Sequence, residues 1–470
     1  MKTHHFIFSC ILATSAFFFG CQQEVSPLLP EGENDGNPGA QSESLLIDPA
    51  ITELSEIHAQ NVARLFRQKS IETKAGGVTL TTTTETVTPI LDEEGDPLMY
   101  VINFADNGGF TIVSATKSYY PILAYADEGH FDCPEVLPGG IDIWVTERKE
   151  EILYCKENEA SLDTSFKLMW SEYEMQAEAP PMTRAEISDA TSALLSAWTA
   201  NGYSVVPLSA ADAVIPSNYY TNFTNLVNTN ANPQYASWAF VIYKRSNSEY
   251  TKGPLLGNIA WHQGNGFNNL IPGQPVPAAG CVNIALAQIM YYHQYPGSYN
   301  WSAMSPTTGN PAAQALIRDL YSATGGNGGA TISQAKSALS SFGYTYTQQD
   351  HNSTTIIQNI NTNRPVYMRG TDSNGNGGHA WVCDGYKTTS PKIDFLLAFV
   401  PNGPVQYDTY GPYSYTSTTT IYYFNHNWGW GSGPETQNGW FSGETIQTTM
   451  NGGPYNPTVD RKELINIAPN

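Results

Sequence analysis

Residue types suited to nucleophilic catalysis occur in three short segments of this 470-residue chain. In the first, Gly280 directly precedes Cys281, Pro275 and Pro277 lie shortly before it, and a run of strong helix formers follows. This pattern puts Cys281 at or next to a helix N-terminus, where unpaired N–H groups lower a thiol pKa and can hold a developing oxyanion. The alternative for this segment alone is a buried, inert cysteine that caps a core helix.

A second segment supplies a histidine. His379 follows a pair of glycines and begins an alternating run that is typical of a strand and ends at Tyr386. Such a histidine is held rigidly and left accessible by its small neighbours, so it could act as a general base that later protonates the leaving amine. A surface or satisfied core histidine is the alternative.

The third segment reads NHNWGWG and begins at Asn425. An asparagine side chain in this segment could accept a hydrogen bond from the ring N–H of the base and fix its tautomer, as the third member of a triad. A flanking tryptophan could shield that bond from water. The alternative is an aromatic core strand with turn glycines, and each segment is a weak signal until the three are taken together.

The elements around these segments predict an α+β fold. Helices are expected at residues 281–292, 311–324 and 332–342, and strands follow at 366–369, 379–386, 395–400 and 418–427. Upstream, the spacing of apolar residues predicts helices at 51–69 and 140–154, with strands at 78–87, 98–104 and 110–113 between them. A helix is also expected at 185–200, whereas residues 201–250 show little periodicity and suggest a linker or an insertion on a domain edge.

Charge divides the chain unevenly. The net charge is -21, and residues 1–190 hold 31 acidic and 11 basic side chains against 12 and 11 in the remainder. The asymmetry indicates separate units and argues against nucleic-acid binding, which needs clustered Lys and Arg. Because the later part is nearly neutral, we expect the acidic part to bind it through shape and apolar burial, with little dependence on salt.

The six cysteines fit no zinc pattern, and no metal or other cofactor is expected. Cys133 and Cys155 could form a disulfide after export or remain free thiols, and the sequence leaves both open. At the N-terminus, Lys2 and a short apolar run end at Cys21, which is typical of a lipoprotein-type signal peptide with a lipidated cysteine. Plain secretion with cleavage nearby is the alternative. Residues 22–47 suggest a flexible tether, and no later segment is long and apolar enough to cross a membrane.

Four strings carry a family resemblance: AAGCVNIALAQIMYYHQYP, GGHAWVCDGY, HNWGWGSGPETQNGWF and WHQGNGFNNLIP. They resemble the motifs of streptopain-like cysteine peptidases, whose papain-like domain has a helical half and an antiparallel β half. The resemblance implies Cys281 as nucleophile, His379 as base, Asn427 as its orienter and Gln263 as an oxyanion donor. It also implies that Trp428 covers the contact between Asn427 and His379, while the neighbouring His426 is incidental.

The resemblance extends upstream. The string GFTIVSATKSYYPILAYADEGHFD resembles the inhibitory propeptide of the family, and ELINI near the C-terminus resembles its closing strand. The implied organisation is a signal peptide at 1–21, a tether at 22–47 and a small α+β propeptide domain at 48–160. A linker or insertion with the activation cleavage follows at 161–250, and the peptidase domain spans 251–470. Candidate cleavages follow Arg184 or the pair Lys244 and Arg245.

The implied function is that of an exported zymogen of a cysteine endopeptidase. Its partners would be protein and peptide substrates and its own propeptide, with contact to a membrane only through the lipid anchor, at the cell surface or outer membrane. Two other functions are considered: a catalytically decayed surface binding protein on the same scaffold, and a cell-wall amidase or transpeptidase with a similar Cys-His pair.

Overall fold

The computed structural model describes residues 45–73, 80–134, 137, 139–158, 165–175, 189–233, 238–326, 328–371, 378–402, 408–433, 436–443 and 459–470. The expected signal peptide with Cys21, most of the tether, and Arg184 lie outside the described residues. Residues 44–470 form one compact unit. None of the helices built by the described residues has the length and apolar composition needed to cross a membrane.

The acidic part of the chain folds as an antiparallel meander between helices. Its elements are α1 (Glu56–Thr73), β1 (Thr84–Leu91), β2 (Pro97–Phe104), β3 (Phe110–Ser114), β4 (Ile122–Ala126), α2 (Gly139–Glu157) and α3 (Ser165–Trp170). Alternate residues of β2 serve two cores. Ile102 packs in the cluster of α1, whereas Val101 packs in the cluster of α2. Burial on both faces explains why this strand is an almost continuous apolar run.

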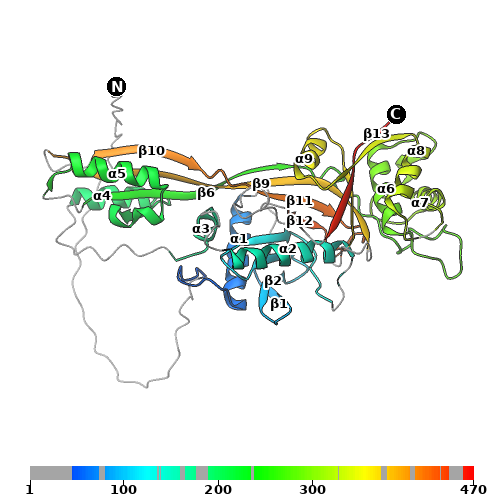
Figure 1. Cartoon of the computed structure of the whole chain (residues 1–470), viewed down its shortest axis with the longest axis horizontal. Coiled ribbons are helices and arrows are strands. Elements are labelled where there is room, and N and C mark those ends of the chain that lie inside the picture. Colours follow the sequence, from blue (N-terminus) through cyan, green and yellow to red (C-terminus); the bar gives the residue numbers. More distant parts are fainter. Residues whose placement is uncertain are drawn as a thin grey trace, which may run out of the picture. The chain divides into compact units, whose positions relative to one another are not determined.

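The later part of the chain contains a helical layer and an antiparallel sheet, which confirms the expected α+β class. The helices are α6 (Cys281–His293), the short η4 (Trp301–Ala303), α7 (Pro311–Ala323), α8 (Ile332–Ser341) and α9 (Ser353–Asn361). The strands are β7 (Tyr344–Asp350), β8 (Val366–Thr371), β9 (His379–Phe399), β11 (Ile421–Asn427), β12 (Gly439–Ser442) and β13 (Asp460–Pro469). Figure 1 shows α6, α7 and α8 gathered at one end of the long strands.

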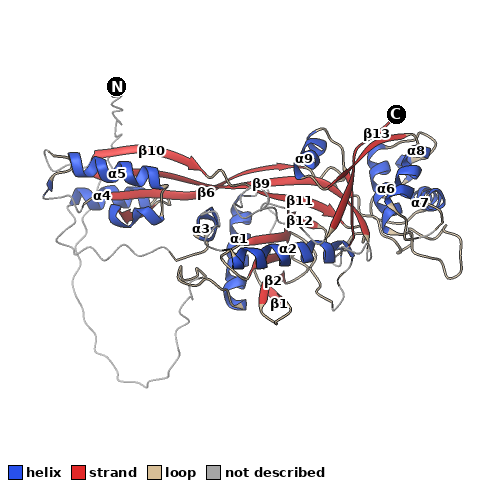
Figure 2. Ribbon diagram, in the orientation of Figure 1, coloured by secondary structure: helices blue, strands red, loops and turns tan. Residues whose placement is uncertain are grey.

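One sheet joins the two parts. Among the described strands, the order is β1-β2-β3-β4-β12-β11-β9-β8-β13-β7, and β4 pairs with β12 through Tyr125 opposite Trp440 and Ala124 opposite Phe441 (Figure 2). The acidic part therefore adds its strands to the sheet that carries His379.

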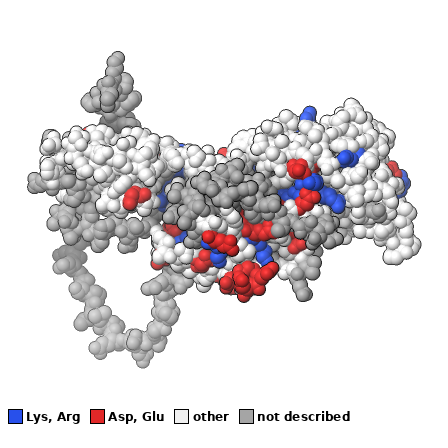
Figure 3. Space-filling view, viewed as in Figure 1, with Lys and Arg blue, Asp and Glu red and all other residues white. Residues whose placement is uncertain are grey.

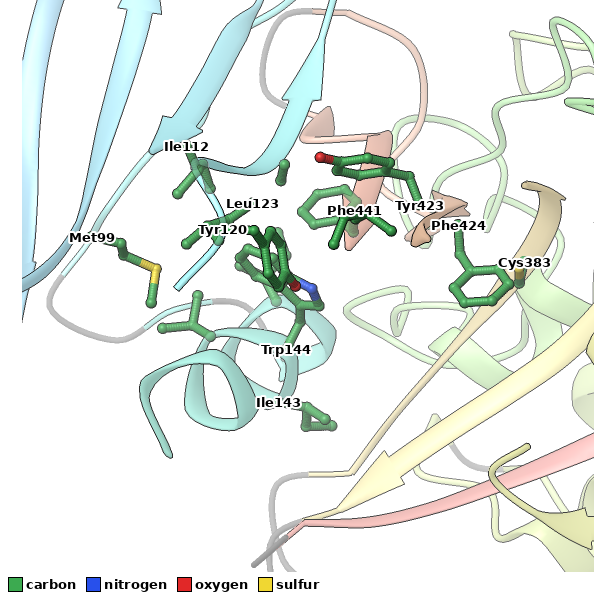
Figure 4. Packing of buried hydrophobic residues seen from close by; sticks show 14 of the residues in the cluster. Met99, Ile112, Tyr120, Leu123, Ile143, Trp144, Cys383, Tyr423, Phe424 and Phe441 are labelled. Carbon is green, nitrogen blue, oxygen red and sulfur yellow. The ribbon is translucent and has the colours of Figure 1, made fainter. Parts of the chain in front are cut away.

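A single apolar cluster fills the junction. Trp144 of α2 meets Phe441 of β12 at a ring-centroid distance of 5.1 Å and an interplanar angle of 78°. Figure 4 shows Tyr120 and Trp144 beside Phe441, with Cys383 of β9 at the far side of the cluster. The fully buried side chains on both sides of this junction make apolar burial the main contribution to its stability.

A buried charged group also crosses the junction. Arg148 of α2 donates to the carbonyl oxygens of Ser442 and Gly443, each at 3.0 Å, and pairs with Glu151 at 2.9 Å. Glu147 pairs with Arg461 of β13 at 2.8 Å. Salt screens buried ion pairs only weakly, so these pairs are consistent with binding between the two parts that depends little on salt.

Residues 201–250 contain regular structure that the sequence pattern does not reveal. Together with α4 (Asp189–Thr199), they form β5 (Ser204–Pro207), η2 (Leu208–Ala213), α5 (Ser217–Asn230) and β6 (Phe240–Lys252). β6 pairs with β9 along its whole length, and β10 (Asp408–Thr416) pairs with the second half of β9. The structure favours an insertion over a linker, and Lys244 and Arg245 lie inside a paired strand instead of a cleavable loop.

Surface charge differs between these regions (Figure 3). Acidic side chains gather over the β1–β2 hairpin, whose turn carries Asp92, Glu93, Glu94 and Asp96. The sequence of α5 contains no charged residue. The acidity inferred from the sequence therefore belongs to the part that precedes the insertion.

The cysteines of the acidic part do not form a disulfide. Cys133 and Cys155 are free thiols. Burial raises the pKa of Cys133 to about 11 and the pKa of Cys155 to about 12. The two thiols are therefore protonated at neutral pH, and the disulfide left open by the sequence is not formed.

Replacement of Arg148 by Met tests the contribution of the buried charged group. The change leaves Glu151 buried without its cation, so we expect the free energy of unfolding to fall by about 3 kcal/mol. Guanidinium-induced unfolding of the full chain measures this. Arg318→Met is the control because Arg318 and Asp319 form an exposed pair, which is worth about 1 kcal/mol or less. Equal losses in the two variants would contradict the assigned role.

Candidate active site

Cys281 is the first residue of α6, as the sequence predicts. Gly280 precedes it with φ 85°, and a side-chain Cβ on Gly280 would lie 2.3 Å from the carbonyl oxygen of Gly328. Only glycine fits this position, because both the backbone angle and the close approach exclude a side chain. The Asn283 amide donates to the carbonyl of Ala279 at 2.8 Å and its oxygen accepts from Thr324 at 2.8 Å, which fixes the first turn of the helix.

Neighbouring groups act in opposite directions on the pKa of the Cys281 thiol. Burial raises the pKa of this thiol, whereas the N–H groups of Ala380, Val282 and Cys281 itself and the positive charge of Arg369 lower it. Burial has the largest effect, and the pKa is raised overall. In this arrangement the sulfur is therefore a neutral thiol at pH 7, although the N–H groups that would stabilise a thiolate are already in place.

His379 begins β9 and is buried, with 4% of its surface exposed. Its Nε2 lies 2.9 Å from the backbone carbonyl oxygen of Trp428. Since a carbonyl oxygen can only accept, Nε2 must carry the hydrogen, and the lone pair of the neutral ring is on Nδ1. Burial lowers the pKa of His379 to about 4, and the charge of Arg369 acts in the same direction.

Aromatic rings enclose this imidazole. Trp430 stacks on it at 5.1 Å with an interplanar angle of 16°, and Trp381 lies at 6.2 Å with an angle of 14°. The sequence motifs draw attention to Trp428, but its indole is fully buried and donates to the carbonyl of Gln437 at 3.0 Å. Trp430 and Trp381 are therefore the site residues that sequence reasoning missed. The sequence could have indicated Trp381, because residues two positions apart in a strand, such as His379 and Trp381, share one face.

The start of α2 covers the imidazole. A Cβ on Gly140 would lie 2.7 Å from Cδ2 of His379 and 2.7 Å from Cε3 of Trp428. The backbone of the acidic part thus occupies the space directly against the ring. In the described part of the chain, no hydrogen bond joins the Cys281 sulfur to His379.

The Asn427 side chain does not contact the base. Its amide donates to the carbonyl of Ile259 at 2.7 Å, and its oxygen accepts from the N–H of Gly429 at 3.2 Å. Both ends of the amide are engaged in holding backbone segments. In this structure Nε2 of His379 bonds the Trp428 carbonyl, and the structure does not bring the Asn427 side chain into a hydrogen bond with the imidazole.

His426, expected to be incidental, supports the aromatic enclosure. Its Nδ1 accepts from the indole N–H of Trp381 at 3.2 Å, and its ring stacks on Phe441 at 5.7 Å. Burial lowers the pKa of His426 well below the ordinary value. The residue therefore stays neutral and holds Trp381 in place.

Gln263 lies close to the head of α6. Its backbone carbonyl accepts from the N–H of Ala279 at 2.7 Å, two residues before Cys281. Its side-chain amide forms no hydrogen bond within the described residues, which leaves two donors available at this position.

A buried carboxyl group anchors the segment that leads to Gln263. Asp384 of β9 accepts from the N–H of Leu256 at 2.8 Å through Oδ2. Burial raises its pKa to about 7, and the hydrogen bond from Leu256 opposes this effect. Further along, the N–H of Trp261 donates to Gln288 of α6 at 3.1 Å. The chain segment that leads to Gln263 is thus hydrogen-bonded to both β9 and α6.

Asp384→Asn gives a test of this carboxyl group by pH. The unfolded chain loses the Asp384 proton near pH 4, whereas the folded chain keeps it up to about pH 7. The wild type should therefore lose stability relative to the variant as pH rises from 4 to 7, by on the order of 3 kcal/mol, and the difference should be constant above that. Asparagine keeps an acceptor for Leu256. Urea unfolding at intervals from pH 4 to 8 measures the difference, and parallel curves would contradict the account.

Comparisons with known proteins match two separate parts of the chain to two different families. Residues 51–152 match the model of the Spi protease inhibitor family, and residues 261–314 match that of the peptidase C10 family. A curated relative, the thiol protease/hemagglutinin PrtT of Porphyromonas gingivalis, is 23% identical over 346 residues. The match covers 63% of this chain and 32% of that protein, so the chain spans about a third of its length.

Two solved structures from Prevotella intermedia are also similar. A prointerpain A fragment is 14% identical with a TM-score of 0.42, covering 81% of this chain and 98% of the fragment. Active interpain A is 17% identical with a TM-score of 0.30, covering 46% of this chain and 94% of that protein. The two family models confirm the resemblance to the streptopain family: residues 51–152 are similar to the Spi protease inhibitor family and residues 261–314 to the peptidase C10 family.

Proposed function

We propose that this chain is the latent precursor of a cysteine endopeptidase. Cys281 is the nucleophile and His379 the base. The carbonyl of Trp428 orients the imidazole, and the N–H of Cys281 and the amide of Gln263 hold the oxyanion. The contact of Gly140 with His379 carries the proposal of latency, because a segment of the inhibitor family lies directly on the candidate base.

The protonation states support latency. Burial leaves Cys281 as a thiol and His379 as a neutral imidazole, whereas nucleophilic attack needs a thiolate. Removal of α2 would let water reach the imidazole and bring its pKa back toward the ordinary value, so that it can accept the thiol proton.

The proposed reaction has two steps. The thiolate attacks the peptide carbonyl carbon, and the negative oxygen is held by the Cys281 N–H and the Gln263 amide. His379 gives its proton to the leaving amine as the C–N bond breaks, which leaves an acyl-enzyme. The neutral imidazole then takes a proton from water, the resulting hydroxide attacks the thioester, and the acid product leaves as the sulfur regains its charge.

The surrounding assignments follow from the same proposal. Protein and peptide substrates are the partners, and residues 48–160 act as the inhibitor. Activation cleavage would fall before α4, with Arg184 as the candidate, because Lys244 and Arg245 are held in β6. The insertion would then remain with the peptidase part. Export as a lipoprotein through Cys21 rests on the sequence of the N-terminal segment.

Labelling with an epoxide that alkylates the thiol of cysteine peptidases tests the reaction. After the full chain has been processed, we expect one label at Cys281 and loss of digestion of an unfolded protein. The Cys281→Ala chain should take no label and should digest nothing. Absence of labelling would favour a decayed binding protein, and labelling without proteolysis but with cell-wall cleavage would favour an amidase.

Gly140→Ala tests latency. The added methyl group cannot fit between His379 and Trp428, so we expect the docked state to lose about 2 kcal/mol. Activity of the unprocessed chain should then rise roughly 30-fold. Gly297→Ala is the matched control, since a Cβ there meets no atom within 4 Å. Equal activity of the two unprocessed variants would contradict the proposed contact.

A further inference from the structure

Arg369 lies on β8 beside the two candidate catalytic groups. It is opposite Ala380 in the strand register, and Ala380 follows His379. Tyr367 of β8 and Ala380 both pack in the cluster that contains α6. Because alternate residues of a strand share a face, Arg369 is on the face of β8 that is turned toward the helix of Cys281.

The guanidinium bridges the sheet and the helical layer. Its Nη1 donates to the carbonyl of Ala330 at 2.7 Å, and Ala330 ends the glycine-rich connection between α7 and α8. Gly328 of the same connection packs on Gly280, directly before the nucleophile. Arg369 and the nucleophile are therefore held by the same connection, and the guanidinium lies close enough for its charge to act on the Cys281 sulfur.

Arg369 carries a positive charge next to the candidate site. Among the described residues, no carboxylate forms an ion pair with it, and its side chain is half-buried. Its Nη1 donates to Ala330, the Tyr367 side chain also interacts with the guanidinium, and the planar group suits a carboxylate well. Its field reaches both Cys281 and His379.

We infer that Arg369 is a specificity-determining residue that favours substrates with an Asp or Glu side chain close to the scissile bond. The inference rests on the proposed peptidase function. The recognition is a charge-assisted hydrogen bond between the guanidinium and the substrate carboxylate.

Matched peptides separate this role from an effect on the sulfur. Cleavage sites in a denatured protein digest, mapped by mass spectrometry with the processed full chain, identify the position at which acidic residues are enriched. Two fluorogenic peptides that differ only by Glu or Gln there are then compared. Any influence of Arg369 on the Cys281 thiolate is the same for both peptides, so the ratio of their kcat/KM values reports recognition alone.

We expect the wild type to prefer the Glu peptide about tenfold. Arg369→Gln should remove the preference, Arg369→Lys should keep part of it, and Arg369→Glu should reverse it in favour of a Lys peptide. Arg318→Gln, which changes an arginine on the exposed face of α7, should leave the ratio unchanged. Cleavage without acidic enrichment, or a preference that survives in Arg369→Gln, would overturn the inference alone. Absence of cleavage together with an unlabelled Cys281 would overturn the proposed function as well.

Discussion

The hydrogen bond from Nε2 of His379 to the carbonyl oxygen of Trp428 is the interaction on which the candidate site depends. It fixes which ring nitrogen carries the proton and where the other nitrogen can point. Trp430 stacks on the same ring and Gly140 lies against its Cδ2, so these neighbours keep the ring buried. Water that reached this ring would change both its charge and its reach toward Cys281.

The rest of the fold maintains that burial. β4 pairs with β12, and α2 shares one apolar cluster with β9, β11 and β12, which places Gly140 on the histidine with little freedom. Arg148 fixes the orientation of the contact because it donates to the carbonyl oxygens of Ser442, at the end of β12, and of Gly443. A contact of this kind combines a large apolar area with a few oriented polar groups, so we expect it to depend little on the strong acidity of the preceding part. We therefore expect α2 to leave His379 after the chain is cut or opens locally, and not after a change in ionic strength.

Sequence patterns predicted the elements that carry the nucleophile and the base, because periodicity and glycine placement act locally. The helix at Cys281 and the strand at His379 begin where the glycines indicate. The strands predicted at 379–386 and 395–400 are one strand, β9, since the polar residues between them pair with β6 and need no turn. The insertion was hidden because the second half of β6 is polar and largely exposed and because α5 is rich in Asn, Thr and Tyr. The orienting carbonyl of Trp428 could not be predicted from residue types, because every residue offers a backbone oxygen and only tertiary packing selects one.

The imidazole titration of His379 in the intact chain tests this account most directly. NMR of the full chain with labelled histidine, compared with a His379→Gln chain to assign the resonance, gives the pKa before and after processing. The account predicts a His379 pKa near 4 in the intact chain and a clear rise once the inhibitor part has been removed. A pKa near 6.5 in the intact chain, unchanged by processing, would contradict it.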